Sequence, residues 1–441
     1  MTAPRMPNIP NPFAVPELKE KILFTLLCLL IYRLGAHITV PGVDAQAVLA
    51  FFASQTSQTL FGVYNLFVGG ALSKATVFAL GIMPYISASI FFQIMGAVFP
   101  TVERLQKEEE GRKKITQWTR YLTIGLAAAQ AYGITIFLES GVQGAVATPS
   151  FFFRITTMFF LTVGAVFIMW LGEQITERGL GNGMSLLIFF SIIEGGVPSV
   201  QRTIEALSAG SLTVPRLVLL LVVMVVVVWF TVAITVAARR IPIQIPRKVM
   251  GRGRIREGQK SFIPLRINSA GVMPIVFAQS IIIVPGTLAQ FSNVGVLRDL
   301  SQAFQPGTWW YYLAYTVLII FFTFFYTAII FNPVDLAENL KKQGGFIPGV
   351  KPGARTAEYI DHVLSRVTLP GSIFLTVIAI LPIILLDYFN VPFAFGGTSL
   401  LIVVGVALDT VQQMQQHMIL RQYDGFMKEG RVKFRGRQRY M

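Results

Sequence analysis

The residues that could do chemistry are sparse in this chain of 441 residues, and none forms a recognisable catalytic pattern. The single cysteine, Cys28, rules out a disulfide framework, and the three histidines His37, His362 and His417 are far apart in sequence. The chain has no phosphate-binding glycine loop, no metal-binding histidine pair at helical spacing and no nucleophile-elbow serine. Gly179–Gly183 superficially resembles a dinucleotide turn, but it lies between two apolar runs and predicts only a flexible turn. We therefore expect no enzyme, no metal and no cofactor.

Carboxylates are the remaining candidates, because ion-coupled carriers usually bury them in the middle of the membrane. Glu173 and Glu177 lie at the cytoplasmic end of the fourth apolar run, Glu194 lies near the outer end of the fifth, and Asp409 lies near the inner end of the tenth. None is central. This placement disfavours an ion-coupled carrier, and a small-molecule secondary transporter remains the alternative function.

The elements that must position such residues are membrane spans. The composition is 54% hydrophobic and 13% charged, and the mean hydropathy is +0.62. Ten apolar runs are each long enough to cross a hydrocarbon core of about 30 Å. They cover residues 22–40, 76–100, 121–138, 151–172, 184–200, 213–237, 269–290, 308–331, 368–386 and 396–415.

Basic residues indicate the orientation of these spans. Most of the 37 Lys and Arg lie in the N-terminal segment, the C-terminal tail and the gaps 101–120, 173–183, 238–267 and 332–367. Basic loops stay on the cytoplasmic side, so an even number of spans places both termini in the cytoplasm. Because topology accounts for the net charge of +15, we expect no DNA partner.

Several spans are more than lipid-facing helices. The second run carries Gly81, polar side chains and Pro84, which we expect to kink the helix at its middle. The third carries Gln130 and the seventh carries Gln279, so these three helices should face one another or a wet cavity. By contrast, Val218–Phe230 is typical of lipid-exposed helix.

The outer gap after the first run contains an apolar segment, Leu60–Leu72, that is too short and too glycine-rich to span. A re-entrant segment folded into the bundle accounts for it; a segment lying on the membrane surface is the alternative. The sequence predicts an all-α integral membrane protein, with a possible division into residues 1–200 and 201–441, five spans each.

Four long stretches closely resemble the SecY family, the channel-forming subunits of bacterial protein translocases. They are Leu80–Met95, Trp170–Ile188, Asn332–Gly353 and Pro392–Asp409. The resemblance runs essentially from end to end in matching order. It implies ten helices in two pseudo-symmetric halves around a central pore, a re-entrant plug, an aliphatic constriction and a lateral gate opening to lipid. The implied function is passage of unfolded secretory polypeptides across the plasma membrane and sideways release of membrane segments.

Carried over by position, the resemblance assigns a site to each of these parts. The constriction is formed by Ile82, Ile86, Met184, Ile188, Val276 and Ile402, with Met184 and Val276 standing where the family often has isoleucine. The plug is formed by Asn65, Leu66, Phe67, Val68, Gly69 and Gly70. From span placement we add Ser87, Gln93, Gln130 and Gln279 as polar contacts of the lateral gate.

The resemblance also implies partners. The cytoplasmic loops 238–267 and 332–367 are the expected docking sites of the SecA motor ATPase or the ribosome, and the tail 418–441 is strongly basic as well. The docking candidates are Arg247, Lys248, Arg252, Arg254, Arg256, Lys351 and Arg355. Lys351 stands where the family commonly has arginine, and a lysine cannot reproduce a planar two-pronged contact. SecE and SecG subunits, preprotein signal sequences and membrane lipid are the other expected partners.

Overall fold

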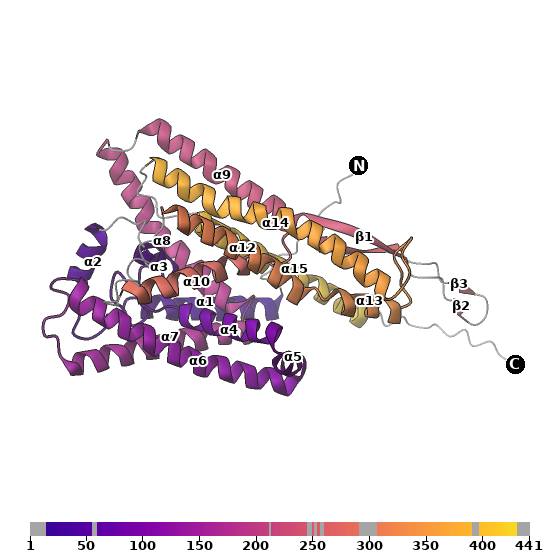
Figure 1. Cartoon of the computed structure of the whole chain (residues 1–441), viewed down its shortest axis with the longest axis horizontal. Helices are drawn as coiled ribbons and strands as arrows, with labels where there is room; N and C mark the ends of the chain where they lie inside the picture. Colours follow the sequence, from indigo (N-terminus) through magenta and orange to yellow (C-terminus); the bar gives the residue numbers. More distant parts are fainter. Residues whose placement is uncertain are drawn as a thin grey trace.

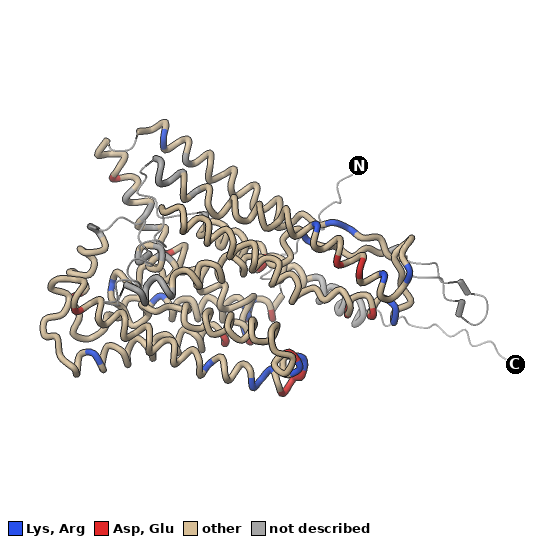
Figure 2. The backbone as a smooth tube through the Cα atoms, viewed as in Figure 1, with Lys and Arg blue, Asp and Glu red and all other residues tan. Residues whose placement is uncertain are grey.

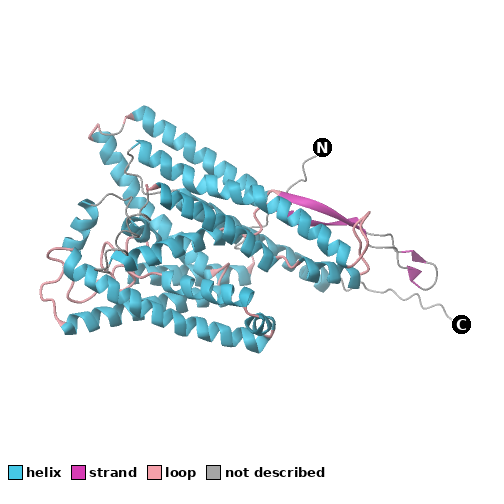
Figure 3. Cartoon of the chain, in the orientation of Figure 1, coloured by secondary structure: helices cyan, strands magenta, loops and turns pink. Residues whose placement is uncertain are grey.

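The computed structural model describes residues 15–54, 60–210, 213–244, 249–250, 254–255, 260–290, 307–389 and 397–429. The described chain is mostly helical (Figures 1 and 3). The helices before the first strand are α1 Pro16–Gly35, α2 Ala45–Ser54, α3 Leu60–Phe67, α4 Met83–Val98, α5 Pro100–Lys107, α6 Glu109–Ile136, the π-helical turn η2 Phe137–Gly141, α7 Phe151–Arg178, α8 Gly183–Ser208 and α9 Val214–Val236. The later helices are α10 Met273–Gln290, α12 Trp309–Ile330, α13 Pro333–Lys342, α14 Ala354–Phe389 and α15 Gly397–Glu429.

Each predicted apolar run lies largely within one of these helices, except that the second run becomes helical only at Met83. By length and apolar composition alone, five helices in the described ranges could cross a membrane, or six if the bent pair α4–α5 counts as one span. The apolar parts of α8 and α10, Gly183–Gly196 and Met273–Ile283, are shorter. The prediction for Val218–Phe230 is confirmed at the level of exposure, because only 12% of the apolar window of α9 is buried.

The prediction for Pro84 is wrong. Pro84 lies in the first turn of α4, where its missing N–H would have no helical partner anyway, so it starts the helix instead of kinking it. The residues before it form turns instead of helix, and Gly81 has a φ of +54° there.

A tight elbow joins α4 to α6 through α5, which bends by 110° from α4. The side-chain amide of Gln106 in α5 donates to the carbonyl of Phe92 at 3.2 Å, and the same side chain fills the space beside Gly96. Gly111 at the start of α6 packs directly on the carbonyl of Leu105, where a Cβ would not fit. The loop expected at 101–120 is therefore largely helical and closely packed.

Capping residues set where the site-bearing helices begin. The side-chain oxygen of Asn182 accepts hydrogen bonds from the backbone N–H groups of Met184 and Ser185, at 3.1 and 3.4 Å, and so starts α8. Thr308 starts α12 through the N–H of Tyr311 at 3.4 Å. The turn Gly179–Gly183 thus has a structural role: it ends α7 and presents the first residues of α8 to the bundle interior.

The expectation of an all-α chain needs correction, because strands lie between α9 and α10. β1 Ala238–Gln244 pairs antiparallel with β4 Lys260–Arg266, and β2 Val249–Met250 pairs with β3 Arg254–Ile255. Side chains on β1 alternate, with Ile241 and Ile243 buried between exposed neighbours. This alternation explains the strand.

The two long loops between the apolar runs form one body. Gln244 in β1 and Phe346 after α13 exchange both backbone hydrogen bonds, at 2.9 and 3.0 Å. A separate hydrophobic cluster joins Ile241 and Ile243 to Leu340, Ile347 and Ile360 of the second loop and α14. Figure 2 shows Lys and Arg gathered at this end of the molecule and around α5.

Candidate functional site

A cavity of about 380 Å³ lies among α4, α8, α10 and α15, within the main hydrophobic core. Its apolar wall includes five of the six constriction candidates: Ile86, Met184, Ile188, Val276 and Ile402. They come from four helices that are far apart in sequence. The structure therefore brings these residues together around one space.

The constriction candidates are buried, with Met184 partly so. Met184 and Ile188 stand four residues apart on α8, so both project from one face of that helix. Ile82 differs from the other five. It is buried as the residue that precedes α4, where its carbonyl accepts the N–H of Ile86 at 3.1 Å, and it is not part of the cavity wall.

The apolar segment 60–72 lies against α8 and α10, two of the helices that line this cavity. It consists of α3, which packs against α8 and α10, followed by turns. Phe67 and Val68 are buried at 5% and 1% exposure, which excludes a segment lying on the surface of the protein. The side chain of Leu66 lies outside the described residues.

Polar and close contacts fix the ends of this segment. The hydroxyl of Tyr64 donates to the carbonyl of Leu80 at 2.9 Å. Gly81 faces the methyl groups of Val68, which would lie 3.1 and 3.2 Å from a Cβ. Asn65 closes the following turn, since its carbonyl accepts the N–H of Gly70 at 2.8 Å. The segment is thus tied to the chain that leads into α4.

The four lateral-gate candidates do not form one polar cluster. Ser87 donates to the carbonyl of Met83 on its own helix at 3.1 Å, and Gln93 donates to Ser89 on the same helix at 3.0 Å. Among the described residues, the carbonyl oxygen of Gln130 is buried without a hydrogen-bond partner, whereas the side chain of Gln279 interacts with the hydroxyl of Tyr311 on α12.

Contacts between α4 and the pair α10–α12 come partly from residues that sequence reasoning missed. Ser280 on α10 lies 3.6 Å from the sulfur of Met83 on α4. Gln93 on α4 interacts with the hydroxyl of Tyr326 on α12. A serine directly after Gln279 was the one available signal, because polar side chains are rare in such runs.

Charged residues also line this cavity, and sequence reasoning gave them no role. Arg120 on α6 donates to both oxygens of Glu173 on α7, at 2.9 and 2.8 Å. Glu177 and Asp409 line the same cavity. Three of the four carboxylates noted from the sequence therefore line one cavity, whereas Glu194 lies elsewhere, paired with Arg33.

The motor and ribosome docking candidates are only partly described. Arg247, Lys248, Arg252 and Arg256 lie outside the described residues, and only the backbone of Arg254 is described, in β3. Lys351 is exposed beside the start of α14, and its carbonyl accepts the hydroxyl of Thr356 at 2.9 Å. Arg355 is exposed and pairs with Glu358 at 3.3 Å.

Comparison with known proteins identifies the family. The SecY family model matches residues 76–411. The protein translocase subunit SecY of Escherichia coli (strain K12) is 46% identical over 428 residues, which cover 96% of each chain. A solved structure described as "The structure of a protein conducting channel" matches with a TM-score of 0.65 at 16% identity, over 97% of this chain and all of the other.

A second solved structure matches with a TM-score of 0.63 at 17% identity, over 97% of this chain and all of the other. Its description states that the plug domain of SecY stabilises the closed state of the translocation channel and maintains a membrane seal. The whole length of this chain is thus similar to SecY in sequence and to a protein-conducting channel in fold. The chain belongs to the SecY family: it is a multi-pass membrane protein and the protein-conducting subunit of a translocase, a channel and not an enzyme.

Proposed function

We propose that the ten apolar runs each cross a bacterial plasma membrane as one helix, with both chain termini in the cytoplasm. The halves 1–200 and 201–441 then enclose a pore through which unfolded secretory polypeptides pass. The observation that carries this proposal is the cavity whose wall combines five aliphatic or methionine side chains from α4, α8, α10 and α15. The clustering of basic residues at one end of the molecule supports the orientation (Figure 2).

The side chains of the constriction lack hydrogen-bonding groups, and this absence is the basis of its function. Ile86, Ile188 and Ile402 offer no hydrogen bonds, so a passing polypeptide is not held. An apolar collar also tends to exclude water and ions. Met184 is flexible and adapts its shape to the passing chain. The ring therefore seals around a substrate without binding it strongly.

The plug closes the pore at rest. Its proposed residues Asn65–Gly70 comprise the end of α3 and the turn after it, which packs between α8 and the residues that lead into α4. Gly69 and Gly70 adopt φ values of +68° and +78°, which glycine tolerates without strain. We propose that this turn is the joint on which the plug leaves the pore.

The lateral gate is the seam between α4 and α6 on one side and α10 and α12 on the other. The helices of the two sides touch at the α4–α10 and α6–α10 contacts. Across this seam lie the Ser280–Met83 and Gln93–Tyr326 contacts, and the buried amides of Gln130 and Gln279 lie on opposite sides of it. Few strong polar bonds cross the seam among the described residues, so a sufficiently apolar signal sequence can part it into lipid.

Cytoplasmic partners supply the driving energy. The body formed by β1, β4, α13 and the start of α14 presents Lys351 and Arg355 at its surface. We propose that it receives the SecA motor or the ribosome, whose RNA phosphates would bind basic residues in a salt-sensitive way. SecE and SecG are the proposed membrane subunits.

Cross-linking of an arrested substrate tests this function. A photoreactive residue is placed in turn at Ile86, Ile188 and Val276 during export of a preprotein that stalls halfway. The same residue at Val225 on α9, which is 68% exposed, is the control. We expect the stalled chain to label the first three positions and not the fourth. Labelling of none of the three would contradict a pore at this cavity.

The small-molecule transporter, the alternative left open by the sequence, is superseded by the family match, and it makes a different prediction. It predicts saturable solute uptake into liposomes that contain this chain alone. The channel predicts none.

A further inference from the structure

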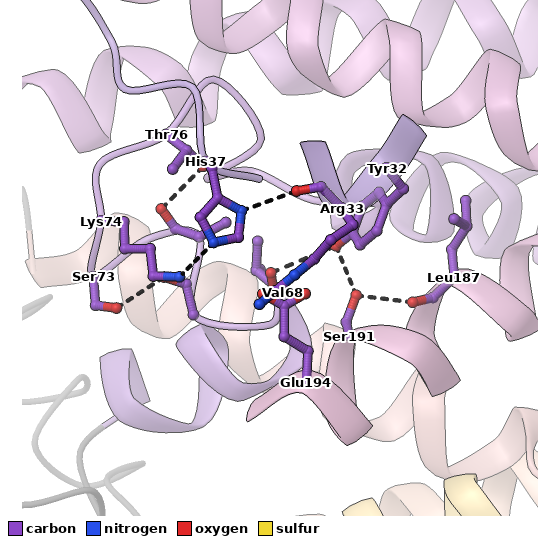
Figure 4. Close-up of polar contacts among 12 residues, drawn as sticks. Tyr32, Arg33, His37, Val68, Ser73, Lys74, Thr76, Leu187, Ser191 and Glu194 are labelled. Atoms are coloured by element: carbon purple, nitrogen blue, oxygen red, sulfur yellow. Dashed lines mark hydrogen bonds and ion pairs between the residues drawn. The ribbon is translucent and has the colours of Figure 1, made fainter. Parts of the chain in front are cut away.

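An ion pair joins two distant helices beside the plug. Arg33 in the last turn of α1 pairs with Glu194 of α8 (Figure 4). The Glu194 side chain is only 8% exposed, whereas that of Arg33 is 42% exposed. A carboxylate so well covered is stabilised mainly by its partner cation, so the pair is more than a solvated surface contact.

The turn that follows α3, here called the plug turn (residues 68–70), covers this ion pair. At Gly69, a Cβ would lie 3.1 Å from the backbone Cα and O of Ser191 and 3.4 Å from a carboxylate oxygen of Glu194. The backbone of the turn therefore rests directly on α8 at the ion pair. When the plug leaves, the carboxylate loses this cover and water can reach it.

The hydroxyl groups of Tyr32 and Ser191 contribute little to holding the plug. The hydroxyl of Tyr32 lies 2.7 Å from that of Ser191, which donates to the carbonyl of Leu187 at 2.8 Å. The carbonyl of Val68 is farther from Tyr32, at 3.5 Å. The two hydroxyl hydrogens of Tyr32 and Ser191 thus have three possible acceptors. The two short contacts, Tyr32–Ser191 and Ser191–Leu187, involve no plug residue. The plug can leave without stranding either hydroxyl.

A second cation, Lys74, lies close to Arg33, so the negative charge of Glu194 offsets two positive charges. Burial and then the charge of Arg33 lower the pKa of Lys74, which lies just after the plug. Lys74 also lies 3.3 Å from the ring of His37, whose other nitrogen contacts the carbonyl of Arg33 (Figure 4). Without the carboxylate of Glu194, Arg33 and Lys74 would repel each other across the base of the plug.

We propose that the Arg33–Glu194 ion pair is a latch that holds the plug in its closed position. The attraction between the two charges is strongest while the plug turn excludes water, because a lower local dielectric strengthens it. Displacement of the plug weakens the pair, and this difference in free energy favours the closed state. The latch rests on the proposed role of residues 65–70 as a plug.

The test compares two ion pairs of matching exposure. Glu194→Gln keeps the shape of the side chain and removes its charge. Glu139→Gln does the same to the pair formed with Arg154, whose exposures of 47% and 8% are close to those of Arg33 and Glu194. Each variant is purified with its bound subunits, and its resting ion conductance is measured in planar bilayers. Deletion of residues 66–70 is the reference for an absent plug.

We expect Glu194→Gln to raise the resting conductance about tenfold, since breaking a half-covered pair costs more than an exposed pair and less than a buried one. Glu139→Gln should leave the conductance unchanged. The exchanged pair, Arg33→Glu with Glu194→Arg, should restore a low conductance.

Two outcomes would overturn the latch alone. In the first, Glu194→Gln keeps a low resting conductance while the deletion raises it. In the second, Glu194→Gln and Glu139→Gln raise the resting conductance equally. A deletion that does not leak would instead overturn the plug itself. If Glu194→Gln does not fold, Arg33→Gln tests the pair from α1, with the same expected rise in conductance.

Discussion

Replacing Gly69 by alanine separates the strain of its backbone from the contact it makes. The φ of +68° costs an alanine about 1–2 kcal/mol wherever it occurs. The new methyl group would also lie 3.1 Å from the Cα and O of Ser191. Because α8 is a helix and cannot yield easily, this crowding adds about 1–3 kcal/mol. Gly144→Ala is the matched control, because its φ is +80° and nothing lies within 4 Å.

The crowding between the new methyl group and Ser191 can be relieved only if the plug moves away from α8. A bias of about 1–3 kcal/mol corresponds to about a 5- to 150-fold shift toward the displaced plug. We expect Gly69→Ala to raise the resting conductance of planar bilayers within that range, and Gly144→Ala to leave it unchanged.

A labelling assay reports the same movement directly. The chain has one cysteine, Cys28, which is 3% exposed. A Ser73→Cys substitution therefore gives a nearly isolated reporter for a membrane-impermeant maleimide. Gly69→Ala should speed its labelling. If Gly69→Ala seals as well as the parent and labels no faster, the plug turn does not rest on α8 and the reasoning fails.

Three further predictions concern other contacts. Tyr64→Phe removes the hydroxyl bond to the carbonyl of Leu80 and leaves that buried segment with an unpaired carbonyl, so it should loosen the plug by about 1–3 kcal/mol, seen as a raised resting conductance. Glu173→Gln breaks a two-pronged pair with Arg120; it should lower the thermal stability in detergent by about 1–2 kcal/mol, and an unchanged melting temperature would contradict the bidentate geometry. Ile241→Ala should destabilise the cytoplasmic body by about 2–4 kcal/mol, seen as faster cleavage there in limited proteolysis while the membrane helices stay protected.

The membrane helices could be predicted from the sequence because apolar length is a strong and local signal. Val218–Phe230 needs no tertiary context to be recognised as lipid-facing helix. The start of α4 could not be found this way. Residues 76–82 are as apolar as the helix that follows, but they form turns with positive φ at Gly81. Tertiary contacts hold them there: Thr76 forms a β-bridge with Thr39, and Gly81 packs on Val68.

The β-hairpin was missed although its signal was present. Ile241 and Ile243 alternate with Arg240 and Pro242, which is the period of a strand, but the charge of the loop drew attention to docking instead. The residues of the proposed constriction could not be found from a local sequence pattern. Its residues come from four helices, and no local pattern unites them; the resemblance to a family was needed to choose Val276 and Ile402 from many similar residues.

The Arg33–Glu194 ion pair lay beyond local reasoning. The two residues are far apart in sequence; Glu194 was noted only as a charge near the outer end of the fifth apolar run, and Arg33 was assigned no role. Opposite charges at the same depth of a membrane protein do suggest partners. Choosing between Glu194 and other carboxylates required the arrangement of α1 beside α8 that the structure provides.

The elbow that joins α4, α5 and α6 would limit how the proposed lateral gate can open. Gly111 sits against the Leu105 carbonyl and Gln106 occupies the space beside Gly96, so the connection has no slack. In the proposed lateral gate, α4 and α6 would then move as one unit. A partner that contacts the exposed side of α5 would move both helices at once.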